Sequence, residues 1–221
     1  MSMLSEASRR ILATHQLDDA EIAKSIIAEM GGDWHNSLRP SSLIDAIVCS
    51  DEIKHNDPSG STREQLSIRH DRAVVASVIA ATHPRAVVET GTSSGLSSAI
   101  FLYSMIVANH GFLFSVDLPH KAEWTEITNT KLSHSAAIVP PGWRNRHVNI
   151  IEDAKTALPR ILPSLKPSIF IHDSLHTVTH MLFEYSVARA FMPRKSLLVS
   201  DDILWNEAFL GFCQITRSKF Y

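Results

Sequence analysis

The sequence predicts an α/β protein built on a doubly wound, mostly parallel sheet. From Ala86 onward, short apolar runs typical of buried strands alternate with stretches of helical apolar spacing. A small-residue turn with two glycines, Gly91 and Gly95, joins the first such strand to the first helix. Acidic residues close every expected strand, and the carboxyl ends of parallel strands share one edge of a sheet. These observations indicate a ligand-binding edge.

Size and composition fit one main domain with a complete core. The chain has 221 residues, 44% of them hydrophobic and 20% charged. A formal net charge of −2 gives no electrostatic basis for binding nucleic acid or an anionic membrane. Cys49 and Cys213 have neither metal-type spacing nor the pattern of a disulfide framework. No stretch resembles a signal peptide or a membrane span, so we expect a cytoplasmic protein.

Two regions are expected. Residues 1–60 form an N-terminal helical segment, in which residues 5–30 have amphipathic spacing. Residues 61–221 form the main domain. The soft boundary between them falls in residues 54–62, the one stretch with linker composition.

Local spacing predicts the elements of the main domain. Ser61 and Glu64 have the capping-box form, which predicts a helix that runs to Pro84. Five strands are expected, at residues 86–90, 112–118, 147–152, 168–173 and 196–203. Helices are expected at residues 96–108, 122–135, 154–165, 178–191 and 205–215. Each crossover is expected to be right-handed.

The turn after the first strand suits a nucleoside or an anionic group. A helix that begins at Leu96 presents unpaired N–H groups and a positive dipole end. Gly91 and Gly95 let a ligand approach the backbone closely. Glu89 lies on the strand side of the turn, where a carboxylate would accept a hydrogen bond from the ligand. Asp117 ends the next strand, in the position where an acid accepts hydrogen bonds from ribose hydroxyls.

A second group of acids closes the last two strands. Asp173 ends one strand, and Asp201 and Asp202 end the other. Their hard oxygen atoms suit Mg²⁺, Mn²⁺ or Ca²⁺. Each acid also has a plain alternative as the N-cap of the helix that follows. Crowded carboxylates repel one another unless hydrogen-bond donors or a cation offset them, which favours a site over capping alone.

Several motifs together resemble one family. The motif VVETGTSSG (residues 87–95) and the motif SVDL (residues 115–118) resemble the cofactor-binding motifs of class I S-adenosylmethionine-dependent methyltransferases, whose fold is Rossmann-like. IIEDA (residues 150–154) resembles the segment that borders adenine. FIHDSLHT (residues 170–177) with LLVSDDILWNEAF (residues 197–209) resembles the metal-dependent small-molecule O-methyltransferases, especially the branch of macrocin-type sugar O-methyltransferases and cephalosporin-hydroxylase-like proteins.

The resemblance implies methyl transfer from S-adenosylmethionine to a hydroxyl of a small molecule, a sugar or a secondary metabolite, assisted by Mg²⁺ or Mn²⁺. It implies His176 as general base, with Asp173 in the catalytic set, and Asp173, Asp201 and Asp202 as metal ligands. The implied cofactor-binding residues are Glu89, Gly91, Thr92, Ser93, Gly95, Asp117, Asp153 and Asp173.

The chain departs from the family pattern in two places. Ser93 stands at the middle of the turn, where many of these proteins have glycine. The family's sheet usually ends in an antiparallel hairpin, for which Tyr221 comes too early, so we expect a short or missing C-terminal hairpin. An open sheet edge would favour a homo-oligomer.

Two alternatives remain open. Besides the methyltransferase, the chain could be a catalytically silent regulatory or assembly module that binds S-adenosylmethionine without metal, or a different enzyme on this fold. A nicotinamide oxidoreductase is disfavoured because GTSSG lacks the G-x-G-x-x-G spacing. An iron oxygenase is disfavoured because His172 and His176 straddle a strand end. Helical spacing places Trp205, Phe209 and Phe212 in the core or at a lid edge in preference to an aromatic substrate cage, and we expect His180 on the helix surface.

Overall fold

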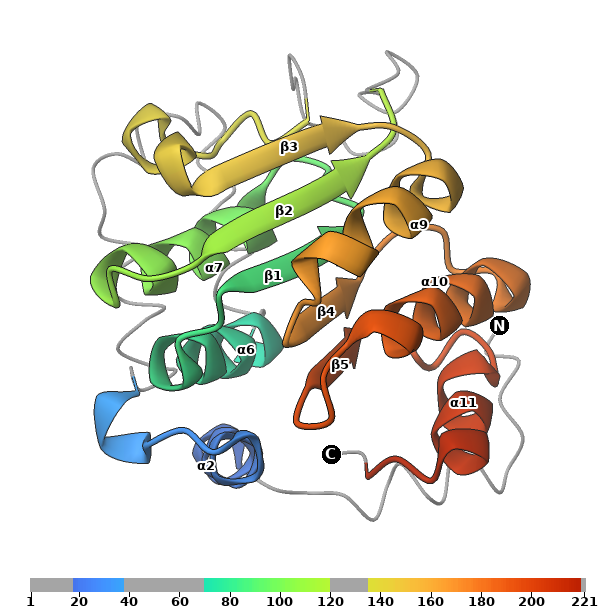
Figure 1. The fold of residues 1–221 in the computed structure, drawn as a ribbon, viewed down its shortest axis with the longest axis horizontal. Coiled ribbons are helices and arrows are strands. Elements are labelled where there is room, and N and C mark those ends of the chain that lie inside the picture. Colours follow the sequence, from blue (N-terminus) through green and yellow to red (C-terminus); the bar gives the residue numbers. More distant parts are fainter. Residues whose placement is uncertain (1–17, 38–69, 120–134, 220–221) are drawn as a thin grey trace.

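Five parallel strands form one sheet at the centre of the computed structural model (Figure 1). The structure describes residues 18–37, 70–119 and 135–219. The strands are β1 (Ala86–Thr90), β2 (Phe112–Asp117), β3 (His147–Ile151), β4 (Ile169–His172) and β5 (Leu197–Ser200). Their spatial order is β3-β2-β1-β4-β5, and every neighbouring pair is parallel. The predicted Rossmann-like α/β sheet is confirmed.

Helices cover both faces of this sheet (Figure 1). One layer contains α6 (His70–Thr82) and α7 (Leu96–Val107), with α2 (Asp19–Met30) packed against α6. The other layer contains α9 (Ala154–Leu165) and α10 (Val178–Phe191), with α11 (Ala208–Thr216) beside α10. Two short 3-10 turns, η1 (Trp34–Asn36) and η2 (Pro141–Arg146), lie in connections.

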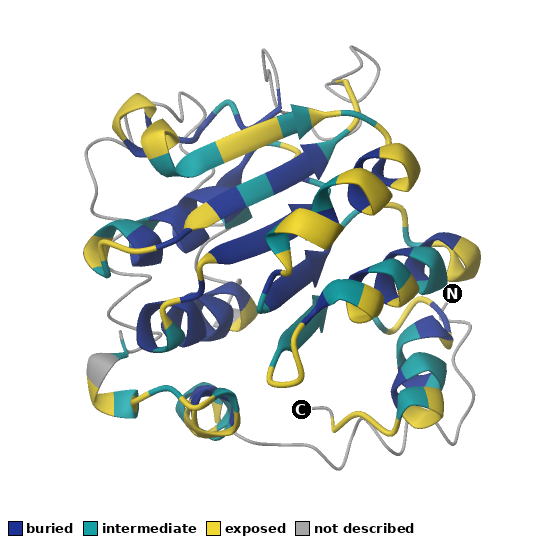
Figure 2. Ribbon diagram, viewed as in Figure 1, coloured by how far each residue is buried: buried dark blue, intermediate teal, exposed yellow. Residues whose placement is uncertain are grey.

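The central strand β1 separates two apolar cores. Val87 packs into the core under α6 and α7, and Val88 packs into the core under α9 and α10. This alternation follows from the period of two in a strand. All five residues of β1 are buried, and Figure 2 shows the buried residues concentrated in the central strands and on the inner faces of the helices. A strand that is buried on both faces gives the sequence its continuous apolar run.

Most predicted elements have the expected bounds. Helices α9 and α10 match the predicted ranges, and α2 lies within residues 5–30 and ends at Gly31, which has a φ of 82°. The last helix begins at Ala208 and not at residue 205, with Glu207 at its N-cap position, and the Asn206 side chain before it accepts the Ala208 N–H at 2.9 Å. The predicted helix at residues 122–135 and the Ser61–Glu64 capping box lie outside the described residues, apart from residue 135.

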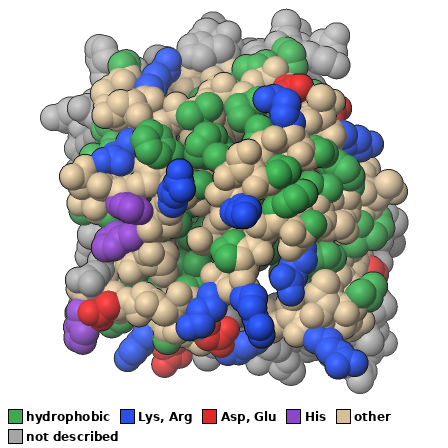
Figure 3. Space-filling view, viewed as in Figure 1, with side chains coloured by type: hydrophobic (Ala, Val, Ile, Leu, Met, Phe, Trp, Pro, Cys, Tyr) green, Lys and Arg blue, Asp and Glu red, His purple; other side chains and the backbone are tan. Residues whose placement is uncertain are grey.

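The surface over α9 and α10 carries more basic than acidic side chains (Figure 3). On the face covered by α9 and α10, Lys and Arg side chains are spread widely and Asp and Glu side chains are sparse (Figure 3). Among the described residues, no helix has both the length and the apolar composition needed to cross a bilayer.

Candidate active site

Strand register brings the predicted site residues into one row. Thr90 pairs with Val116 on one side and with His172 on the other, and His172 pairs with Ser200. The residues that follow these paired positions therefore lie side by side across the sheet, in the order Asp117, Gly91, Asp173 and Asp201. Strands lie about 5 Å apart, so the carboxyl edge carries three carboxylates around one glycine. The row crosses the switch in strand order between β1 and β4.

Both glycines of the turn are required by their surroundings. Gly91 has a φ of 79°, and a Cβ there would lie 1.9 Å from the Asp173 carbonyl oxygen. Gly95 has a φ of 92°, and a Cβ there would lie 2.7 Å from Ala136 Cα. Gly95 precedes α7 and supplies no capping side chain. Within the described residues, the N-cap position therefore supplies no side-chain acceptor to the N–H groups of the first turn of α7, which suit an anionic ligand.

Asp117 fastens the end of β2 to this turn. Its Oδ2 accepts the Ser93 N–H at 2.9 Å and the Ser135 hydroxyl at 3.0 Å, and its Oδ1 accepts the Leu118 N–H at 2.9 Å. Thr92 lies in the same turn, and its buried hydroxyl has no hydrogen-bond partner within the described part of the chain. The structure thus brings Asp117 and Ser93 into contact, with Thr92 beside them in the same turn.

Glu89 lies beneath the turn and not on its open side. Its carboxylate is 2% exposed and accepts hydrogen bonds from the hydroxyls of Ser98 and Ser115. Burial raises the pKa of Glu89 to about 6, and the two hydroxyl donors oppose that rise. Glu89 therefore joins β1 to β2 and α7 inside the protein.

Asp153 is the N-cap of the helix that follows it, the alternative role that the sequence allowed. Its Oδ1 accepts the Lys155 N–H at 2.7 Å and caps α9. Its neighbour Glu152 donates its backbone N–H to the Asp117 carbonyl at 2.9 Å, which places this corner beside the end of β2.

An arginine that the sequence analysis did not single out lies among the acids of the last two strands. Arg72 comes from the first turn of α6 and is 1% exposed. One guanidinium nitrogen, Nη2, donates to Asp173 Oδ2 at 2.9 Å and to Asp201 Oδ2 at 2.7 Å. This contact lowers the pKa of Asp201 to about 2, although burial opposes the shift. The crowded carboxylates have a cation between them, and that cation is part of the chain.

The predicted metal ligands do not fit a divalent ion in this arrangement. An ion that bridged Asp173 and Asp201 would bind their oxygens at about 2.0–2.6 Å, in the place taken by Arg72 Nη2. Asp202 has a φ of 49°, and its Oδ2 lies 3.8 Å from His176 Nδ1. Among the described residues, no three His, Cys, Asp or Glu side chains are grouped as metal ligands.

His176 lies between two carboxylates. Its Nε2 is 3.9 Å from Asp173 Oδ1, and its Nδ1 is 3.8 Å from Asp202 Oδ2. Nε2 is buried without a hydrogen-bond partner in the described structure. Burial, then the neighbouring His172, lower the pKa of His176, while the nearby acids oppose the change. The imidazole is therefore neutral at neutral pH and able to accept a proton.

The second feature that the sequence analysis missed is a buried carboxylate beneath His176. Glu184 of α10 accepts hydrogen bonds from Thr90 at 2.6 Å and Ser174 at 2.8 Å, and its oxygens lie 2.6 Å from His172 Nδ1 and 2.8 Å from His180 Nε2. His180 is buried, so its predicted position on the helix surface was wrong. The i, i+4 spacing of His180 and Glu184 was the available signal.

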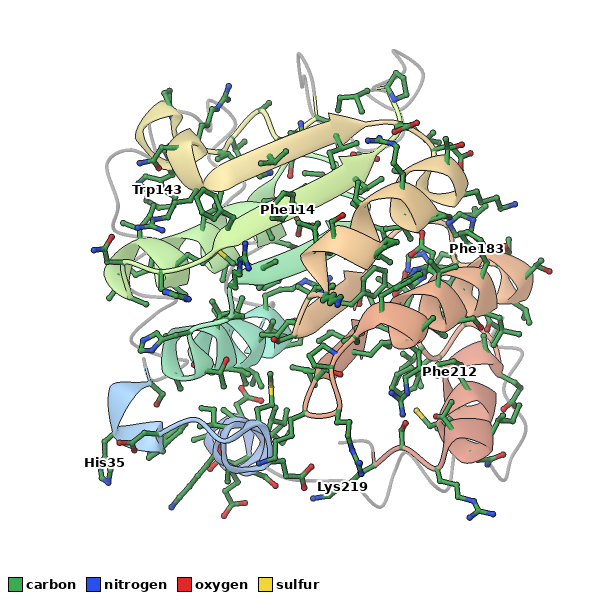
Figure 4. The ribbon with its side chains drawn as sticks, in the orientation of Figure 1. His35, Phe114, Trp143, Phe183, Phe212 and Lys219 are labelled. Atoms are coloured by element: carbon green, nitrogen blue, oxygen red, sulfur yellow. The ribbon has the colours of Figure 1, made fainter. Side chains whose placement is uncertain are left out.

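An exposed aromatic ring lies beside His176. Trp205 is 59% exposed, and its ring lies 5.5 Å from the His176 ring. Leu175, next to His176 in the sequence, Val178 at the start of α10, and Leu204, next to Trp205, are also exposed. Of the two places expected for Trp205, the core is wrong and a lid edge stays a prediction, whereas Phe212 faces α10 and its ring lies 5.3 Å from that of Tyr185 (Figure 4).

The chain matches the model of the family described as "Methyltransferase domain" over residues 88–203. That range begins in β1 and ends just after the acids that follow β5. It contains the turn, Asp117, His176 and both acidic strand ends. A search of the curated proteins gives no match.

Two solved structures show the same fold. One is the apo structure of CalS11, described as a TDP-rhamnose 3'-O-methyltransferase of calicheamicin biosynthesis, with 14% identity, a TM-score of 0.50, and coverage of 80% of this chain and 83% of that chain. The other is the methyltransferase PaMTH1 of Podospora anserina with bound SAH, with 11% identity, a TM-score of 0.50, and coverage of 92% and 72%.

Proposed function

Because the chain belongs to the methyltransferase family whose model spans β1 to β5, we propose that it transfers the methyl group of S-adenosylmethionine to a hydroxyl of a small molecule. One observation carries the proposal: the glycine turn, Asp117 and the His176 imidazole stand along a single sheet edge, at the switch in strand order. A cofactor held by the glycine turn and Asp117 would have its methyl group directed toward His176.

The cofactor lies on the turn in this proposal. The backbone of Gly91, Thr92, Ser93 and Gly95 approaches the methionine part, and Asp117 accepts hydrogen bonds from the ribose. Asp153 borders the adenine through its place beside β2. Glu89 acts from below, through the hydroxyls that hold the turn.

His176 accepts the proton. Methyl transfer from a sulfonium is an in-line displacement, so the protein must orient the acceptor oxygen and make it nucleophilic. Since Nε2 is buried, the acceptor hydroxyl meets Nδ1, on the side of Asp202. Asp173 Oδ1, beside Nε2, favours the tautomer with the proton on Nε2. Asp202 then stabilises the imidazolium that forms.

The acceptor has a flat or apolar portion beside its hydroxyl. The exposed Trp205 ring beside His176 offers such a portion a surface, and Leu175, Val178 and Leu204 are exposed close to these two residues in the sequence. A sugar or a secondary metabolite has this character, and the description of CalS11 names a sugar hydroxyl. The predicted Mg²⁺ or Mn²⁺ is not part of the mechanism, because Arg72 takes its place between Asp173 and Asp201.

Calorimetry and product release test the proposal together. We expect saturable binding of S-adenosylmethionine that Asp117→Ala weakens by at least about tenfold, the loss of one charge-assisted hydrogen bond. We expect S-adenosylhomocysteine release over a panel of nucleotide sugars and phenolic glycosides, abolished in His176→Ala with cofactor affinity unchanged. A chain that does not bind the cofactor refutes the proposal. Binding without turnover on any acceptor favours the silent module.

A further inference from the structure

We propose that Arg72 is the resident cation of this edge, so that the Asp173–Asp201 pair binds no divalent metal and methyl transfer is metal-independent. The part of this inference that concerns transfer rests on the proposed function; the part that concerns the cation does not. The observation behind it is one nitrogen atom, Arg72 Nη2, within hydrogen-bond distance of both carboxylates, at 2.9 Å and 2.7 Å.

The guanidinium is held on every side. Its Nε donates to the Ser97 hydroxyl at 3.1 Å, its Nη1 donates to Asp71 Oδ2 at 2.5 Å, and its Nη2 bridges the two strand-end acids. All three nitrogens have acceptors in different directions, and the side chain is 1% exposed. A planar fork bound in this way is fixed in place, unlike a surface arginine that swings aside when an ion arrives.

The fold explains how Arg72 reaches this place. Helix α6 runs into β1 through a short turn, so its C-terminus is near the amino ends of the strands and its first turn is near their carboxyl ends. Arg72 in that first turn therefore faces the strand-end acids. Ser97 lies in the first turn of α7, directly after the glycine turn. The same side chain thus links the acids to the turn that is proposed to hold the cofactor.

The charges favour the guanidinium over an added ion. Arg72 offers one positive charge to Asp71, Asp173 and Asp201 without losing any bound water of its own on binding, because it is already inside the protein. A divalent ion would have to displace it and leave a buried guanidinium without its partners. Removal of Arg72 would instead favour binding of a divalent ion, because the adjacent carboxylates would then have no cation between them.

Arg72 also sets the orientation of Asp173. Its hold on Oδ2 leaves Oδ1 facing His176 Nε2. Arg72 is accordingly a positioning residue, which acts on the proton acceptor through Asp173.

Titration with Mn²⁺ alone, followed by electron paramagnetic resonance, tests the proposal without cofactor or acceptor. We expect no saturable binding by the wild-type chain up to about 1 mM, a concentration at which even weak carboxylate sites fill. Arg72→Met, which keeps the length of the side chain and removes its charge, is expected to gain one Mn²⁺ site. That site should disappear in Arg72→Met combined with Asp201→Asn. Arg85→Met, an exposed arginine at the amino end of β1, is the matched control and should gain none.

Saturable Mn²⁺ binding by the wild type that Asp201→Asn abolishes would overturn the proposal, and this measurement needs no Arg72 variant to fold. Wild-type turnover that EDTA removes and Mn²⁺ restores would also overturn it. Failure of S-adenosylmethionine to bind leaves the Mn²⁺ result intact and refutes only the proposed function.

Discussion

His172 Nδ1 lies 2.6 Å from Glu184 Oε2, and both side chains are completely buried. The pair joins β4 to α10 directly beneath the candidate proton acceptor, since the rings of His172 and His176 meet edge to face at 5.2 Å. Glu184 also receives hydrogen bonds from β1 and from the start of the β4–α10 connection. A single carboxylate therefore supports the loop that carries His176.

Removal of this carboxylate should destabilise the fold. Glu184→Ala is expected to lower the free energy of unfolding by about 3–5 kcal/mol, because buried donors lose their acceptor. Urea denaturation measures the change. Ser186→Ala, at an exposed position of the same helix, is the control and should be nearly neutral. Equal stability of the two variants would contradict the role given to Glu184.

Acid should unfold the protein partly through the same residue. Hydrogen bonds from its histidine neighbours, against the opposing effect of burial, lower the pKa of Glu184 from 4.5 to about 2. A carboxyl with a lowered pKa contributes stability that is present above pH 4.5 and lost as the pH falls toward 2. The contribution is about 3 kcal/mol. Unfolding free energies measured between pH 5 and pH 2.5 should fall more steeply in the wild type than in Glu184→Gln.

Glu89 should have the opposite pH dependence. Burial raises its pKa from 4.5 to about 6, so its contribution to stability is present below pH 4.5 and lost as the pH rises through 6. Glu89→Gln keeps an oxygen for Ser98 and Ser115 and carries no charge. Relative to the wild type, this variant should gain about 2 kcal/mol between pH 4.5 and pH 7. A difference that does not change with pH would show that the carboxyl is not protonated in this range.

Gly91 should tolerate no side chain. A Cβ at this position would meet the Asp173 carbonyl oxygen at 1.9 Å, at a φ that disfavours other residues. Gly91→Ala is expected to lower the melting temperature and to abolish binding of S-adenosylmethionine. Gly142→Ala is the matched control, because nothing lies within 4 Å of its added Cβ. Scanning calorimetry with and without cofactor separates the two effects.

Trp205 should affect the acceptor and not the fold. Its exposed ring beside His176 has little packing to lose, so Trp205→Ala is expected to raise the KM for the acceptor about tenfold, the worth of one aromatic contact. The melting temperature and the affinity for the cofactor should stay unchanged. Ile215→Ala, at an 84% exposed position on α11, should leave the KM as it is; a similar rise in both variants would argue against an acceptor surface at Trp205.

Local patterns were sufficient for the order of elements and for most of their bounds. The range of α9 follows from an N-cap at Asp153 and helical spacing to Leu165, both of which are read from neighbouring residues. The row that contains Asp117, Asp173 and Asp201 also follows from sequence, because parallel strands place their carboxyl ends on one edge. The core position expected for Trp205 was wrong because helical spacing does not show where a helix starts, and the last helix starts only at Ala208.

The sequence by itself determined that acids would end the strands and that a glycine turn would stand between them, because strands, turns and caps depend on residues a few positions apart. Only the tertiary structure decided what balances those acids. Arg72 is 101 residues from Asp173 and 129 from Asp201, and in the sequence it follows His70 and Asp71 at the polar start of α6, which gives no signal of burial. No local pattern specifies a contact of that separation. It exists because α6 packs antiparallel to β1 and delivers its first turn to the carboxyl edge of the sheet.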